Sequence, residues 1–251
     1  MDAFDTPFVA LAVILLAQWL SAYVGDVFRR KVRPLKDEDR EDFDLIRNAA
    51  LTLLGLIIGF SFAMAVSRYD QRKTLEEAEA NAIGTEYVRA DILPDEHATK
   101  LRELLARYLD QRVAFYLARD HRQVDRINAE TAKLQAELWS TVLRAVTPQQ
   151  TAVTALVVAG MNDVLNAQGY TQAAWWNRIP VAAWGLMGLV AISCNLLFGY
   201  GERRGTGLAL ALPLIVSISF FLIADMDSPR AGVIRVSPQN LIALSQTMKP
   251  H

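Results

Sequence analysis

Apolar residues along this chain gather in four blocks, separated by polar and charged segments. The blocks cover about residues 8–24, 48–67, 181–200 and 208–224, and each has the composition of a membrane-spanning helix. In the first block, basic residues follow the apolar run, which is the reverse of a secretory signal, so we expect a retained anchor. The pattern predicts an all-α membrane protein with four transmembrane helices.

A polar, helix-forming insert lies between the second and third blocks. Its apolar residues recur every three or four positions from Leu101 to Tyr116 and again from Val124 to Val142, a spacing typical of packed helices. Leu134 and Leu138 belong to the second seam. The predicted organisation is a transmembrane hairpin at 1–73, a helical extramembrane domain at 74–174, a second hairpin at 175–225 and an extended tail at 226–251. Trp175 and Trp176 are placed at the membrane interface, which indole rings favour.

The second apolar block carries two stripes with a period of four residues, and residues four apart share one face of a helix. The small stripe consists of Leu51, Gly55, Gly59, Ala63 and Ser67, and the bulkier stripe of Thr52, Leu56, Phe60 and Met64. Small residues let a neighbouring helix approach closely, so Gly55, Gly59 and Ala63 are predicted to be helix-packing positions. The bulkier stripe either packs in a bundle or lines a pore. Arg68 and Asp70 then mark the membrane boundary.

This block and its exit resemble the second spanning helix of bestrophins. The resemblance rests on Ile58-Gly59-Phe60 and on Ser67-Arg68-Tyr69-Asp70-Gln71-Arg72. Over nearly all its length the chain also resembles a bacterial, bestrophin-like family of membrane proteins of unknown function. The segments that carry this second resemblance are 59–62, 67–70, 79–85, 89–91, 224–227 and 232–236. It implies the bestrophin arrangement, with four spans and a helical insert between the second and the third.

The resemblance also implies a function. Thr52, Leu56 and Phe60 would form the apolar neck of an oligomeric ion channel, with five copies around the axis, while Arg68 and Asp70 bias ion sign at its mouth. The expected partners are the lipid bilayer, further copies of the chain and permeant ions, and the expected location is the inner cell membrane, crossed several times. The alternative is a non-conducting scaffold or sensor whose insert binds a partner or lipid. That alternative predicts an exposed seam at Leu134 and Leu138.

Charge and chemistry narrow the function classes. The formal net charge of −1 gives no reason to expect nucleic acid binding. His97 and His121 lack metal-ligand spacing, and Cys194 is a single cysteine in an apolar run, so neither a metal nor a cofactor is expected. We find no catalytic constellation and predict that the chain is not an enzyme.

Acidic residues in two places could be mistaken for sites. Glu76, Glu77 and Glu79 are interpreted as a solvated helix face. Asp225 and Asp227 form a pair at a helix end, which without further oxygen ligands is weak evidence for a cation site.

Two arguments disagree about the side of the membrane that the insert faces. The connection between the first two blocks carries seven Lys or Arg and the connection between the last two carries two. Positive charge favours the cytoplasm, which places these connections inside and the insert outside. The resemblance to bestrophins implies a cytosolic insert instead.

Overall fold

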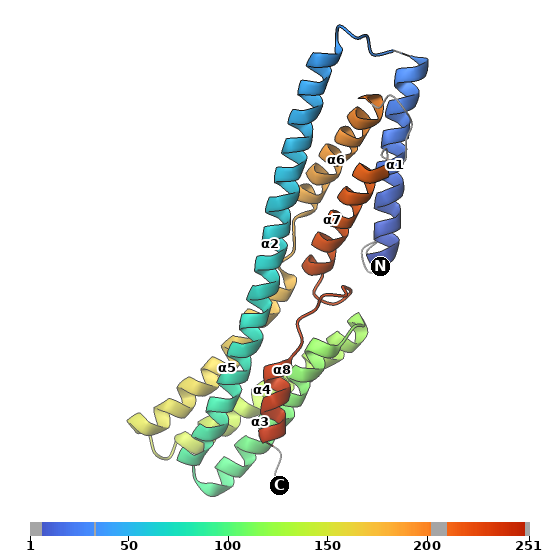
Figure 1. Cartoon of the computed structure of the whole chain (residues 1–251). Helices are drawn as coiled ribbons and strands as arrows, with labels where there is room; N and C mark the ends of the chain where they lie inside the picture. The colour runs from blue at the N-terminus through green and yellow to red at the C-terminus, as the bar shows by residue number, and fades with distance from the viewer. Residues whose placement is uncertain (1–6, 33, 202–209, 249–251) are drawn as a thin grey trace. The chain divides into compact units, whose positions relative to one another are not determined.

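The computed structural model describes residues 7–32, 34–201 and 210–248, and these segments are nearly all helical (Figure 1). In chain order the elements are α1 (Pro7–Lys31), α2 (Arg40–Arg89), the single-turn helix η1 (Ala90–Ile92), α3 (Asp95–Leu117), α4 (His121–Val146), α5 (Ala152–Trp176), α6 (Val181–Gly201), α7 (Ala211–Asp227) and α8 (Gln239–Thr247). No residue within the described ranges lies in a strand. The predicted all-α fold is confirmed.

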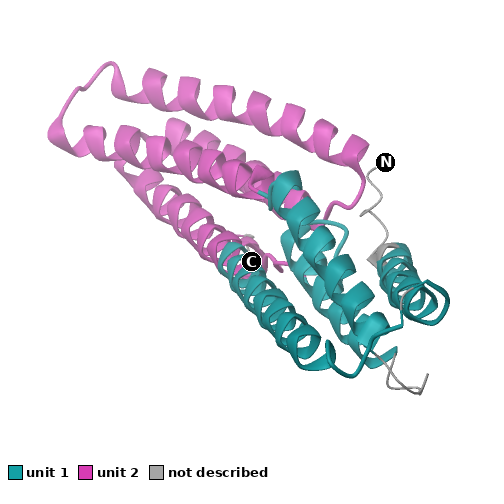
Figure 2. Cartoon of the chain, turned by 90° about the horizontal axis from the view of Figure 1, so that it is seen from above, with its two compact units in different colours: residues 1–68, 178–234 teal, residues 69–177, 235–251 magenta. Residues whose placement is uncertain are grey.

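The chain divides into two units, coloured separately in Figure 2. Unit 1 comprises residues 1–68 and 178–234, and unit 2 comprises 69–177 and 235–251. Helix α2 is 50 residues long, and its first part belongs to unit 1 and its last part to unit 2. Unit 1 holds the apolar blocks, and unit 2 holds the polar insert together with residues 235–251.

Close contact between α1 and α6 organises unit 1. A Cβ atom added to Gly25 would overlap the backbone of Leu196, and one added to Gly199 would overlap the backbone of Ala22. Such contacts are possible only where a residue has no side chain, and they are the usual way in which spanning helices pack. Any larger residue at Gly25 or Gly199 is therefore expected to separate the two helices.

Buried polar side chains also join α1 to α6. Asn195 donates a hydrogen bond to the side-chain oxygen of Gln18 and another, of 2.9 Å, to Ala191 O. Ser21 Oγ donates to Ile192 O at 2.6 Å. Polar groups at membrane depth need such partners because no water is available there.

Three described helical stretches are long and apolar enough to cross a membrane: Leu11–Lys31, Arg40–Ile92 and Ala152–Gly201. The fourth predicted span, 208–224, begins at two residues that lie outside the described part of the chain. Its described portion belongs to α7, which has 17 residues. The number of four spans therefore stays a prediction.

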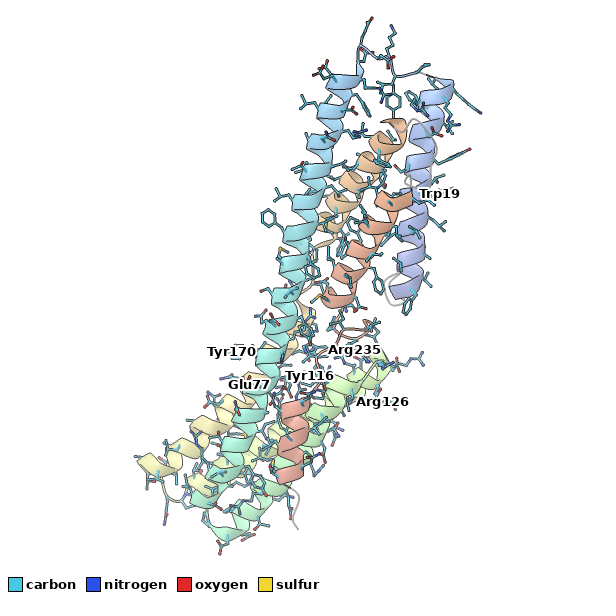
Figure 3. All side chains as sticks on the ribbon, in the orientation of Figure 1. Trp19, Glu77, Tyr116, Arg126, Tyr170 and Arg235 are labelled. Atoms are coloured by element: carbon cyan, nitrogen blue, oxygen red, sulfur yellow. The ribbon has the colours of Figure 1, made fainter. Side chains whose placement is uncertain are left out.

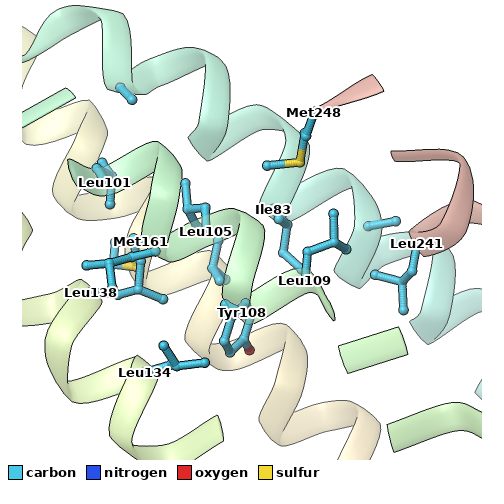
Figure 4. Close-up of a cluster of buried hydrophobic side chains, with 14 of the residues drawn as sticks. Ile83, Leu101, Leu105, Tyr108, Leu109, Leu134, Leu138, Met161, Leu241 and Met248 are labelled. Carbon is cyan, nitrogen blue, oxygen red and sulfur yellow. The ribbon is translucent and has the colours of Figure 1, made fainter. Parts of the chain in front are cut away.

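The core of unit 2 lies among helices α3, α4 and α5, with further residues from the last part of α2 and from α8 (Figure 4). Leu134 and Leu138, on α4, are 1% and 0% exposed, and they belong to the same cluster as Leu101, Leu105 and Met161. The seam predicted on α4 thus finds its partner helices within the chain. The scaffold alternative predicts that Leu134 and Leu138 are exposed, and this prediction is wrong because both side chains are buried.

The C-terminal tail is not extended throughout, which corrects the prediction for 226–251. Residues 228–238 contain no helix, but Gln239–Thr247 form α8, and 249–251 lie outside the described residues. The residue before α8 is Pro238, whose side chain makes no cap hydrogen bond. The carboxylate of Glu76 on α2 accepts hydrogen bonds from Leu241 N at 3.0 Å and from Asn240 Nδ2 at 2.6 Å. It therefore supplies the missing cap from 165 residues away.

Trp175 belongs to the core of unit 2 and not to a membrane interface. It is 4% exposed, and its ring centroid lies 4.9 Å from that of Phe115 and 5.3 Å from that of Tyr116. Its neighbour Trp176 is 74% exposed. The prediction that Trp175 lies at the membrane interface is therefore wrong, because its ring packs against Phe115 and Tyr116 in the core.

Candidate functional site

The part of α2 in unit 1 packs against α6 through one face only. Cys194 Sγ donates to Ala50 O at 3.3 Å, and Ser61 Oγ donates to Met187 Sδ at 3.3 Å. Leu54 and Ala65, which are 2% and 0% exposed, lie on this inward face.

The predicted neck residues lie on the surface of the single chain. Leu56 and Phe60 are 53% and 64% exposed. Thr52 is also exposed, and its hydroxyl donates to Asn48 O at 2.9 Å. The bulkier stripe therefore contributes nothing to the core of its own unit. Its apolar side chains are free to contact lipid, water or another molecule.

The small-residue stripe is exposed as well. A Cβ atom added to Gly55 or Gly59 would meet no atom within 4 Å, and Ala63 is exposed. Within the described ranges, no helix uses the space that Gly55 and Gly59 leave open. The predicted packing role of these residues stays a prediction about contact with another molecule.

The two predicted mouth residues have different surroundings. Arg68 Nη1 lies 2.9 Å from Asp227 Oδ1, and the two side chains are 16% and 8% exposed. Asp227 at the end of α7 also accepts from Ile179 N at 3.1 Å. The charge of Arg68 is thus compensated within unit 1, whereas Asp70 is exposed.

Asp225 and Asp227 bind backbone and side-chain donors of their own chain. Asp225 Oδ1 accepts from Val233 N at 2.6 Å, and its Oδ2 accepts from Ile234 N at 2.7 Å. These bonds hold the segment after α7 against the end of that helix. Among the described residues there is no group of three or more His, Cys, Asp or Glu side chains that could hold a metal ion.

In unit 2 the inward face of α2 carries charges. Its members recur with alternating spacings of four and three: Arg72, Glu76, Glu79, Ile83, Glu86 and Ala90, all buried. Glu76 and Glu79 are 1% and 0% exposed, so their interpretation as a solvated face is wrong, while Glu77 is exposed. The spacing itself is the signal that could have identified them.

Glu79 is the centre of a buried polar cluster that joins α2, α3 and α5. It forms an ion pair with Arg112 Nε, and both side chains are 0% exposed. Tyr116 Oη and Thr171 Oγ1 donate to Glu79 Oε2 at 3.4 and 3.2 Å. Figure 3 draws these side chains on the ribbon, with Tyr116 labelled. The guanidinium of Arg112 also lies 4.5 Å from the ring centroid of Phe115, a cation–π contact.

The cluster shifts the protonation equilibria of its members. Burial alone would lower the pKa of Arg112, but the charge and hydrogen bond of the adjacent Glu79, together with Tyr108 and Tyr116, outweigh burial, so the pKa is raised. Burial raises the pKa of Tyr116, and the Glu79 charge raises it further. Arg112 therefore stays cationic and Tyr116 stays neutral at physiological pH, which makes the cluster a fixed structural element.

Unit 2 also contains a hollow between the end of α4 and the start of α5. Its volume is about 530 Å³, and its lining includes Trp139, Leu143, Thr151 and Val158. No charged residue lines it.

The sequence and the fold were compared with those of known proteins. A family model described as a Bestrophin-like domain matches residues 11–241. A crystal structure of a bacterial bestrophin homologue from Klebsiella pneumoniae is 13% identical, with a TM-score of 0.67, over 95% of this chain and 93% of that chain. A second variant of that homologue gives 13% identity and a TM-score of 0.63 over 95% and 96% of the two chains. A structure described only as a membrane protein is 14% identical, with a TM-score of 0.63, over 95% of each chain. At such identities the structural likeness shows the fold alone. No curated protein matches the sequence.

Proposed function

Because this chain belongs to the bestrophin-like family, we propose that it is an oligomeric ion channel whose pore is lined by α2. The observation that carries the proposal is the outward face of this helix. Leu56 and Phe60 are more than half exposed in the single chain, although their helix contains the most apolar stretch among the three described candidate spans. Copies of α2 arranged around an axis would turn this face toward a central pore.

In such an assembly Thr52, Leu56 and Phe60 form successive rings. Two of the three rings are apolar, and a narrow apolar constriction blocks ions because water leaves it. Gly55, Gly59 and Ala63 lie beside these residues on the helix and, lacking large side chains, let the α2 helices of neighbouring copies approach closely. By the resemblance to bestrophins, the number of copies is five.

The proposed setting is the inner cell membrane, crossed by α1, α2, α6 and the span that includes α7. Exposed apolar side chains on α1, among them Val13, Leu16 and Leu20, suit contact with lipid. At the mouth of the pore, Asp70 is the charge that can act on ions, because Arg68 is paired with Asp227. We infer conduction and not catalysis. The scaffold alternative loses support because the seam that it predicts to be exposed, at Leu134 and Leu138, is buried.

Ion flux from salt-loaded liposomes tests the proposal. The purified protein is compared with Phe60→Ala, which shortens the proposed neck ring, and with Phe62→Ala. Phe62 is 41% exposed on the same helix but lies off the bulkier stripe, so it is a matched control. We expect flux to rise in Phe60→Ala alone. Equal flux in the two variants, with assembly intact, would contradict a neck at Phe60.

A further inference from the structure

One carboxylate on the buried face of α2 has no role in the clusters described above. Glu76 caps α8 and Glu79 pairs with Arg112, but Glu86 is 0% exposed and neither of its oxygens has a hydrogen-bond partner among the described residues. A buried carboxylate without donors is strongly destabilised when it is charged. Glu86 is therefore tolerated at this position mainly in its protonated form.

The surroundings of Glu86 on α5 are equally specific. A Cβ atom added to Gly160 would overlap Glu86 Oε2 and Arg89 Nη1. The backbone of α5 thus lies directly against both side chains, and it can do so only because residue 160 has no side chain. A movement of either side chain at this point must alter the contact between α2 and α5.

Two charged groups face Glu86: Arg89 on α2 and Asp163 on α5. Burial raises the pKa of Glu86 to about 8, against the opposing effect of Arg89 and with a further upward contribution from Asp163. Arg89 is one turn from Glu86 and meets the same glycine. Arg89 is therefore the cation beside Glu86 in the closed contact, and it stays beside an ionised Glu86 when the contact opens to water.

We propose that Glu86 makes the contact between α2 and α5 depend on pH, so that protonation closes it at Gly160 and ionisation loosens it. In the closed contact the neutral carboxyl packs against the α5 backbone. In the loosened contact water and Arg89 can stabilise the carboxylate. This inference concerns unit 2 alone and does not depend on whether the protein conducts ions.

The direction of the pH effect follows from the two protonation equilibria. In an open, solvated contact Glu86 has an ordinary pKa near 4.5, whereas in the closed contact the value is about 8. At a pH between these two pKa values, Glu86 has released its proton in the open form and has kept it in the closed form. The opening equilibrium therefore rises by about tenfold per pH unit in this window and levels off above it. Acid tightens the contact, and alkali loosens it.

Hydrogen–deuterium exchange of the full-length protein in lipid nanodiscs measures this opening. Exchange of the α5 amides around Gly160 is followed from pH 5 to pH 9 and corrected for the intrinsic pH dependence of exchange. For the unaltered protein we expect the opening constant to rise by about tenfold per unit from pH 5.5 to 7.5 and to level off above pH 8.

Three variants make the test specific. Glu86→Gln keeps the shape of the protonated carboxyl and should abolish the pH dependence. Glu77→Gln, at an exposed position of the same helix, should leave it unchanged. Asp163→Asn removes a charge that raises the pKa of Glu86, so the opening constant should level off at a lower pH than in the unaltered protein. A pH-independent opening constant in the unaltered protein would overturn the proposal, and so would the same dependence in Glu86→Gln.

Discussion

The buried ion pair between Glu79 and Arg112 gives a quantitative prediction. Both side chains are 0% exposed, so replacing one of them leaves the other charge uncompensated in the core of unit 2. Breaking such a pair costs about 3–5 kcal/mol. We therefore expect Glu79→Met and Arg112→Met each to reduce the stability of unit 2 by about this amount.

The double variant distinguishes this reasoning from simple loss of packing. With both charges removed, methionines fill a similar volume and no buried charge remains. The remaining cost comes from the Tyr116 and Thr171 hydroxyls, which lose their shared acceptor. An unsatisfied buried hydroxyl costs about 1–3 kcal/mol, and Thr171 can turn to a carbonyl of its own helix. We expect the double variant to be destabilised by about 1–3 kcal/mol, far less than the sum of the single variants.

Amide exchange on α3, between Tyr108 and Tyr116, reports the local opening free energy of each variant in nanodiscs. Glu77→Met is the control, because Glu77 is exposed on the same helix and should change this free energy by less than about 0.5 kcal/mol. If the loss of opening free energy in the double variant equals the sum of the losses in the two single variants, the charges of Glu79 and Arg112 are not coupled. Single effects below about 1 kcal/mol would equally refute the ion-pair argument.

Three further predictions concern assembly, ion preference and the tail. Gly59→Leu should leave the fold of the single chain intact, because no atom lies within 4 Å, but it should prevent assembly, as measured by chemical cross-linking and light scattering. Asp70→Asn should lower cation preference by about fivefold or less, because exposed charges are screened; an unchanged reversal potential under a salt gradient would contradict this. Glu76→Gln should weaken the cap of α8 by about 1.4 kcal/mol and raise amide exchange there about tenfold, while exchange on α4 stays constant.

Much of the fold was predictable because it depends on local periodicity. The apolar blocks and the spacings of three and four residues follow directly from helix geometry, and they identified the long helices of both units. They missed α8, which is short and receives its cap from Glu76, 165 residues away. The two stripes on α2 were also visible in the sequence. Their common exposure was not, because periodicity shows that residues share a face but does not show what that face contacts.

The partners of charged residues were decided by the tertiary structure. Arg68 looked like a free charge at a pore mouth until the fold brought Asp227 within 2.9 Å, from 159 residues away. Glu76 and Glu79 looked solvated because carboxylates usually are, yet α8 supplies donors to the first and Arg112 pairs with the second. Burial of a charge is favourable only when its partners are in place. By itself the sequence determined the long helices and their apolar faces. Only the fold determined α8 and the pairing of the charged residues, because the paired residues lie far apart along the chain.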